Sequence, residues 1–144
     1  MDISIIIFLL GGLFLGWSLG ANDAANVFGT AVGTKMVRFK TAAIVCSIFV
    51  ILGAIISGAG TTETLGKLGA INALPGAFAA CVAAGLSVYL MTKAGLPVST
   101  TQAIVGAIVG WNLYTGSATN VKVLITILGT WVLCPVIAGL IAMG

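Results

Sequence analysis

The sequence predicts an all-α transmembrane protein with about four to five membrane helices. The first helix is expected to be broken, and one segment is a candidate for re-entry into the membrane. Of its 144 residues, 60% are hydrophobic and 6% are charged. Three acidic and six basic side chains cannot supply the polar surface that a soluble domain of this size needs. In addition, apolar runs as long as a bilayer is thick follow one another along the chain. We therefore expect lipid to surround most of the protein.

A helix needs about 20 apolar residues to cross the hydrocarbon layer, and runs near this length define the expected spans. We treat residues 1–144 as a single transmembrane domain. The expected spans are residues 3–19, 41–57, 71–92, 98–114 and 121–143. The span at 98–114 is short and comparatively polar, so it is the candidate for a re-entrant segment that does not cross fully.

Basic residues in the connectors predict the orientation, because short cytoplasmic loops carry an excess of lysine and arginine. Alternating crossings place Lys35, Arg38, Lys40 and Lys93 on one side and Lys67 and Lys122 on the other. This distribution predicts an N-terminus outside the cell, in an integral protein of the plasma (cell inner) membrane.

Glycines are expected to let helices pack closely, and tryptophans are expected to anchor the helices at the headgroups. Glycines recur at the small-xxx-small spacing that lets membrane helices approach closely. They are Gly11-Gly12, Gly16 and Gly20, then Gly29 and Gly33, and Gly106 and Gly110. Tryptophan is enriched at the headgroup level of membrane proteins. We expect such a belt from Trp17, Trp111 and Trp131.

Asp23 is an acid at a depth where lipid is expected, within the run Gly-Ala-Asn-Asp-Ala-Ala-Asn at residues 20–26. A charge at the bilayer centre costs about 2.5–3.5 kcal/mol even on lenient scales, so such residues face the protein interior. We predict that the first helix breaks here. Unwound carbonyls with the side-chain oxygens of Asp23, Asn22 and Asn26 would then bind sodium. The alternative is that Asn22 and Asp23 only end a helix at the interface.

Three consecutive hydroxyl residues, Ser99, Thr100 and Thr101, follow Pro97 where a new helix is expected to start. A helix N-terminus presents free N–H groups and a partial positive charge, so it binds anions without lysine or arginine. The hydroxyls would add donors. The alternative is that they only cap the helix or bond to their own backbone.

A cation-type motif and an anion-type motif in one small bundle indicate coupled uptake of an oxyanion with sodium or protons. Several other classes are not supported. The chain has no histidine and no nucleophile paired with a base, so we expect no enzyme activity and no cofactor. Its basic residues form no stripe for nucleic acid. The three cysteines, Cys46, Cys81 and Cys134, lie singly in apolar runs and are expected to pack.

Residues 20–35 and 97–110 resemble two signature stretches of the inorganic phosphate transporter (PiT) family. The resemblance implies symport of phosphate with sodium or protons, by two inverted-topology halves around a central site. Carried over by position, phosphate would bind Ser99, Thr100, Thr101 and Asn22. The cation would bind Asp23, Asn22 and Asn26, with sodium held chiefly by Asp23 and Asn26. Gln102 stands where the resemblance leads us to expect a histidine.

Only one copy of the signature is present, so the chain is expected to be one half of such a transporter. The second half would come from a longer gene, which we favour, or from another copy in the opposite orientation. Two other functions stay open at this point. One is a permease of the same fold for sulfate or another oxyanion, and the other is a helical membrane subunit that transports nothing.

Overall fold

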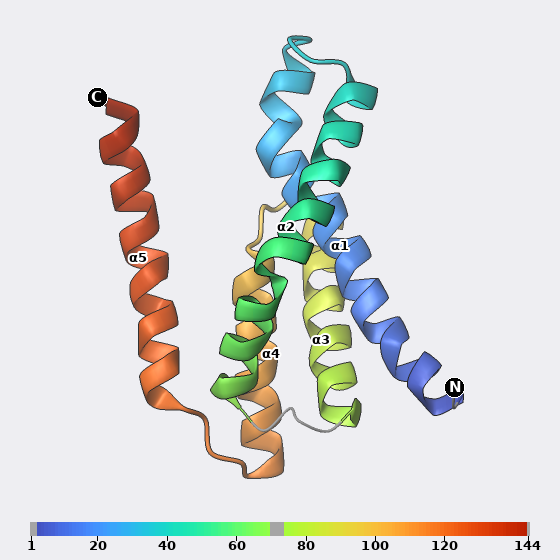
Figure 1. The fold of residues 1–144 in the computed structure, drawn as a ribbon, viewed down its shortest axis with the longest axis vertical. Coiled ribbons are helices and arrows are strands. Elements are labelled where there is room, and N and C mark those ends of the chain that lie inside the picture. The colour runs from blue at the N-terminus through green and yellow to red at the C-terminus, as the bar shows by residue number, and fades with distance from the viewer. Residues whose placement is uncertain (1–2, 70–73, 144) are drawn as a thin grey trace.

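The computed structural model describes residues 3–69 and 74–143, and within them it is all helical (Figure 1). The helices are α1 (Ile3–Gly33), α2 (Phe39–Leu68), α3 (Leu74–Lys93), α4 (Thr100–Thr115) and α5 (Val121–Met143). The predicted all-α transmembrane class is confirmed. In the described residues, α1, α2, α3 and α5 are long and apolar enough to cross a membrane. Residues 71–73 of the expected span 71–92 lie outside the described residues.

Helix α1 does not break at Asn22 and Asp23, and the predicted interruption is wrong. The helix continues through both residues to Gly33, for 31 residues in total. At 1.5 Å per residue it is about 46 Å long. The side chains of Asn22 and Asp23 are paired with groups outside the helix, as described below, so they do not compete for its backbone. The carbonyls of this stretch are engaged in the helix rather than exposed as cation ligands.

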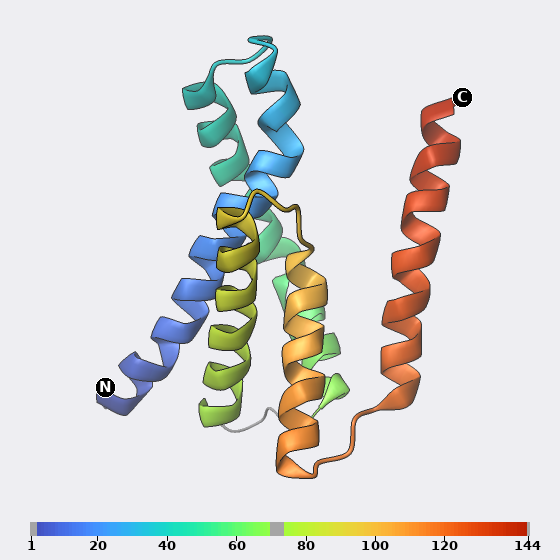
Figure 2. The same ribbon diagram turned by 180° about the vertical axis from the view of Figure 1, so that it is seen from behind.

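The chain forms two helical hairpins of unequal height (Figures 1 and 2). Helices α1 and α2 make the taller one, and α3 and α4 make a shorter one whose connection lies partway along α1. Helix α3 packs mainly against α1 and α4. Helix α5 stands at the side of the bundle, where it contacts α2. The connection carrying Lys93 therefore lies well away from the turn carrying Lys35, Arg38 and Lys40.

A small apolar core joins α2, α3 and α4 near the ends where α2 and α4 finish. It consists of Leu68, Ala80, Val105 and Ile108, all buried. Apolar side chains of α5, including Ile127 and Trp131, pack against this cluster. The core thus holds α5 on the bundle although none of the residues of α5 is itself buried.

Close helix approaches occur at Gly11, which is among the predicted glycines, and at Gly85, which is not. A Cβ on Gly11 would lie 2.7 Å from Phe78 Cδ2, and one on Gly85 would lie 2.8 Å from Phe14 Cδ1. Both positions bring α1 against α3. Gly29, Gly33, Gly106 and Gly110 have no such neighbour within 4 Å among the described atoms. The spacing of these four glycines therefore did not predict the contact.

The α3–α4 connection is built by three local signals. Gly95 adopts a left-handed φ of 71°, and the bonds Gly95 N–H to Thr92 O and Leu96 N–H to Met91 O form a Schellman motif that ends α3. Pro97 follows, and proline cannot continue a helix. Ser99 then caps α4, as its Oγ accepts a hydrogen bond from Gln102 N–H at 3.3 Å. The predicted helix start is confirmed, and it faces the middle of α1.

Candidate functional site

Asn22 ties α1 to α3 and to the connection between α3 and α4. Its side chain is only 4% exposed. Its Nδ2 donates to the carbonyl of Val98 at 2.6 Å, and its Oδ1 accepts from Thr92 Oγ1 at 3.3 Å. The same Nδ2 also donates to Asp23 Oδ1 at 2.9 Å. A buried amide is stable in lipid only when its donors and acceptors are paired, and this one is.

Asp23 lies against the first turn of α4. Its Oδ1 accepts a hydrogen bond from Thr100 Oγ1 at 3.0 Å, across 77 positions of sequence. Thr100 is 6% exposed, and the carboxylate of Asp23 is part-buried. The two predicted motifs are therefore one site, in which the acid of one lies on the helix N-terminus of the other.

The three consecutive hydroxyls have three different environments. Ser99 Oγ caps α4 by accepting a hydrogen bond from Gln102 N–H. Thr100 Oγ1 is directed to Asp23. Thr101 lines a cavity on the other side of α4. This division follows from helical geometry, because successive residues of a helix lie about 100° apart around its axis.

Asn26 lies one turn beyond Asn22 on α1 and is exposed. It makes no hydrogen bond to the residues that the structure describes. The hairpin connection reaches only to the level of Asn22 and Asp23. The structure thus brings Asn22, Asp23 and Thr100 together and leaves Asn26 apart from them within this chain.

The charge at this site is negative and has no basic partner. In the described part of the chain, the salt bridge found joins Lys67 to Glu63 and does not involve Asp23. The N-terminus of α4 offers a partial positive charge that stabilises a nearby carboxylate. A hard cation suits carboxylate, amide and hydroxyl oxygens. No group of three His, Cys, Asp or Glu residues that could hold a metal ion occurs in the described ranges, so any sodium would depend on Asp23 with neutral oxygens.

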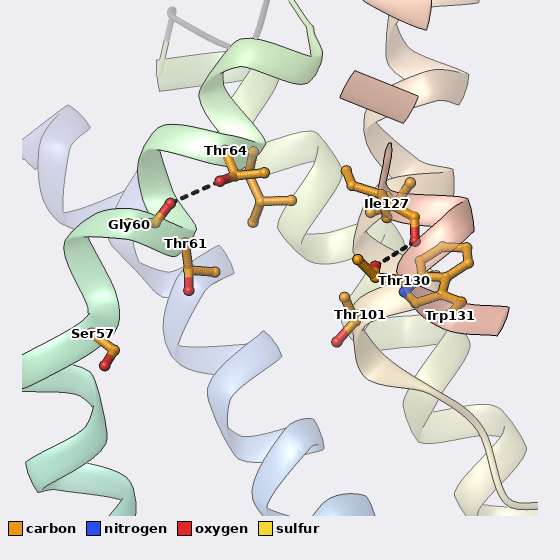
Figure 3. A pocket seen from close by; sticks show the side chains of 10 residues that line it. Ser57, Gly60, Thr61, Thr64, Thr101, Ile127, Thr130 and Trp131 are labelled. Atoms are coloured by element: carbon orange, nitrogen blue, oxygen red, sulfur yellow. Dashed lines mark hydrogen bonds between the residues drawn. The ribbon is translucent and has the colours of Figure 1, made fainter. Parts of the chain in front are cut away.

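A cavity of about 400 Å³ lies between α2, α4 and α5. Hydroxyl side chains project into it from three helices (Figure 3). They are Ser57, Thr61 and Thr64 of α2, Thr101 of α4 and Thr130 of α5. Trp131 completes the α5 side, a position that the expected headgroup belt did not anticipate.

Sequence reasoning missed several groups at or near the site. Thr92 and the Val98 carbonyl contact Asn22, but neither residue type indicates such a role. Ser18, one turn before Asn22, is 1% exposed and its hydroxyl has no hydrogen-bond partner among the described residues. Ser57, Thr61 and Thr64 could have been found, because their spacing places them on one face of a helix.

The fold and the paired motifs define a polytopic membrane protein with a charged site enclosed by helices. The family model of the phosphate transporter family matches residues 19–144. The chain belongs to this family, and the resemblance seen in residues 20–35 and 97–110 is confirmed.

Similar proteins come from distant organisms. A protein of Thermococcus kodakarensis named "Putative phosphate permease" is 36% identical over 99% of this chain and 37% of its own length. A Haemophilus influenzae protein of the same name is 35% identical over 91% of this chain and 34% of its own length. The "Sodium-dependent phosphate transporter" of Plasmodium falciparum is 35% identical over 88% of this chain and 20% of its own length. The chain thus spans between a fifth and little more than a third of the length of these relatives. No solved structure matches it significantly.

Proposed function

We propose that the chain forms one half of a secondary transporter that moves inorganic phosphate across the membrane together with a cation. The observation that carries this proposal is the hydrogen bond between Thr100 and Asp23, which places a carboxylate at the N-terminus of α4. Membership of the phosphate transporter family supports phosphate as the substrate. Ser99, Thr100 and Asn22 are the proposed phosphate ligands beside Asp23. Thr101 is proposed to contact phosphate on the other side of α4, where its side chain lies.

Electrostatics links the anion to the cation at this site. A helix N-terminus attracts an oxyanion, but the carboxylate of Asp23 repels one at the same place. A cation or proton on Asp23 removes that repulsion, and in a site shielded from water the effect is large. Phosphate binding therefore requires prior or simultaneous loading of Asp23. This requirement is what couples the two species in a symporter.

Sodium is the coupling ion that we favour, with the proton as the alternative. The relative from Plasmodium falciparum has a name that states sodium dependence. Sodium would contact Asp23 and the neutral oxygens around it, with Asn22 as the nearest amide. Asn26 would contribute only when another part of the transporter brings it to the site, because it is exposed in this chain.

The remaining half of the site would come from a second transporter half. The upper parts of α1 and α2 extend beyond the α3–α4 hairpin (Figure 1). Inverted-repeat transporters bind substrate where two such halves meet. The orientation that we propose keeps the N-terminus outside, because the cluster of Lys35, Arg38 and Lys40 marks the cytoplasmic end.

Uptake of labelled phosphate into liposomes holding the full-length protein tests the proposal. We expect accumulation when an inward sodium gradient is imposed. Accumulation driven by a proton gradient in sodium-free buffer would identify the proton as the coupling ion instead. Excess sulfate should not reduce the uptake of labelled phosphate. A reduction would show that the site accepts other tetrahedral oxyanions as well. Absence of uptake in correctly inserted protein would instead favour a subunit that transports nothing.

A further inference from the structure

The cavity between α2, α4 and α5 contains hydroxyl groups that have no partner in the protein. Ser and Thr in membrane helices usually bond to a carbonyl one turn earlier. Thr64 does so with Gly60 O at 2.9 Å, and Thr130 bonds to Ile127 O at 2.7 Å. Ser57, Thr61 and Thr101 make no hydrogen bond to the described residues, and each belongs to the cavity lining.

Ser57, Thr61 and Thr101 are exposed in this chain, so their hydroxyls are open to a partner from outside it. A polar group in a hydrocarbon environment without a hydrogen bond costs several kcal/mol. The cavity volume of about 400 Å³ is large enough for several water molecules. Figure 3 shows Ser57 and Thr61 on α2 facing the open space toward Thr101 on α4. A polar guest that enters the cavity with its water can therefore satisfy these hydroxyls.

The lining favours an oxyanion over a bare cation. No carboxylate is among the residues that line the cavity in the described part of the chain. The hydroxyls can donate, and the indole N–H of Trp131 can only donate. Thr101 is the second residue of α4, so the positive end of this helix adjoins the cavity. Neutral donors together with a helix N-terminus form an environment that suits a tetrahedral oxyanion.

The cavity also adjoins the site at Asp23. Thr101 lines the cavity, whereas its neighbour Thr100 donates to Asp23 Oδ1. The first turn of α4 thus separates the two places. A group in the cavity is drawn by the helix N-terminus while α4 lies between it and the carboxylate.

We propose that this cavity is a second, waiting site for hydrated phosphate, which precedes the site at Asp23. The proposal rests on the proposed transport function for the identity of the anion. Phosphate in the cavity accepts hydrogen bonds from Thr61, Thr101 and Ser57, and it binds there without a cation. It moves to the Asp23 site when that carboxylate has been neutralised.

Isosteric substitution tests the role of the cavity hydroxyls in uptake. In the full-length protein, Thr61→Val should raise the half-saturating phosphate concentration about 2- to 10-fold, which corresponds to the loss of one hydrogen bond. Thr62→Val is the matched control, since Thr62 is the next residue of α2 and its hydroxyl bonds to Gly58 O at 3.0 Å. Equal effects of the two substitutions, or no effect of Thr61→Val, would overturn the proposal.

Cysteine protection separates this inference from the proposed function. In protein whose Cys46, Cys81 and Cys134 are replaced by serine, Thr61→Cys should react with a membrane-impermeant thiol reagent. Phosphate should slow that reaction, and sodium chloride at equal ionic strength should not. Protection should persist when Asp23→Asn is added. Loss of protection with Asp23→Asn, protection by sodium alone, or no labelling would refute a separate waiting site. Persistent protection with undiminished uptake by Asp23→Asn would refute only the proposed role of Asp23.

Discussion

The hydroxyl of Thr100 donates a hydrogen bond to Asp23 Oδ1 at 3.0 Å and so joins the middle of α1 to the first turn of α4. Neither residue has another side-chain partner as distant in sequence. Through this bond the acid of the first motif and the helix start of the second become one unit. If the α3–α4 hairpin moves relative to α1, this hydrogen bond must break, unless that part of α1 moves with the hairpin.

Thr100→Val removes this hydrogen bond and keeps the shape of the side chain. We expect a loss of about 1 kcal/mol in the free energy of unfolding, typical of interhelical hydrogen bonds in membranes. We also expect weaker phosphate uptake. Thermal unfolding in detergent and uptake assays measure the two effects. Thr100→Ser keeps the hydroxyl and should retain most of the stability and most of the uptake. Equal losses in Thr100→Val and Thr100→Ser would contradict the role of this hydrogen bond.

Asn22→Leu leaves the Val98 carbonyl and the Thr92 hydroxyl without their partner. The expected cost is about 1–3 kcal/mol of unfolding free energy, because these part-buried groups lose their hydrogen-bond partner. Asn26→Leu is the matched control, as Asn26 is exposed and unpaired among the described residues. The midpoint of thermal unfolding should fall for the first variant and change little for the second. A similar fall for both would show that the Asn22 network does not hold the hairpin.

Gly85→Ala tests the close contact of α3 with α1. The added methyl group would lie 2.8 Å from Phe14 Cδ1 and 3.3 Å from Leu15 Cα, so one helix must shift. Overpacking of this kind costs about 1–3 kcal/mol. Gly12→Ala meets no atom within 4 Å and should be neutral or stabilising, because alanine favours helix. Unfolding midpoints of the two variants distinguish the cases, and an undisturbed Gly85→Ala protein would contradict the packing.

Ser18→Ala removes a buried hydroxyl that has no partner in the described part of the protein. Relief of an unpaired polar group should raise the unfolding free energy by about 1 kcal/mol. The thermal midpoint in detergent measures the change. A decrease would mean that Ser18 Oγ is satisfied in the membrane, by water or an ion, and so contributes to the Asn22 network.

Sequence reasoning predicted those parts of the fold that depend on local composition. The spans 41–57, 98–114 and 121–143 lie within or nearly coincide with α2, α4 and α5, since hydropathy is a property of each segment. The helix start at Ser99 was also predictable, because proline and a capping hydroxyl act within a few residues. The same local signals placed the hydroxyl motif correctly at the start of α4.

The continuity of α1 could not be predicted in this way. Asn22 and Asp23 looked like helix breakers because their partners, Val98, Thr92 and Thr100, lie 70 to 77 positions away. Glycine spacing failed for a related reason. Gly29 and Gly33 have the favourable spacing but no opposing helix, whereas Gly85 has an opposing helix without that spacing. Which side chains meet is decided by how the hairpins pack.

The proposal that a neutralised Asp23 permits phosphate binding is tested most directly by sodium-driven phosphate uptake in liposomes holding the full-length Asp23→Asn protein. Glu63→Gln makes the same chemical change at an exposed ion pair with Lys67 and serves as the control. We predict that Asp23→Asn loses the sodium dependence and the accumulation of phosphate, while its insertion and abundance stay normal and Glu63→Gln transports like the unmodified protein. Sodium-dependent accumulation that survives Asp23→Asn would contradict the account.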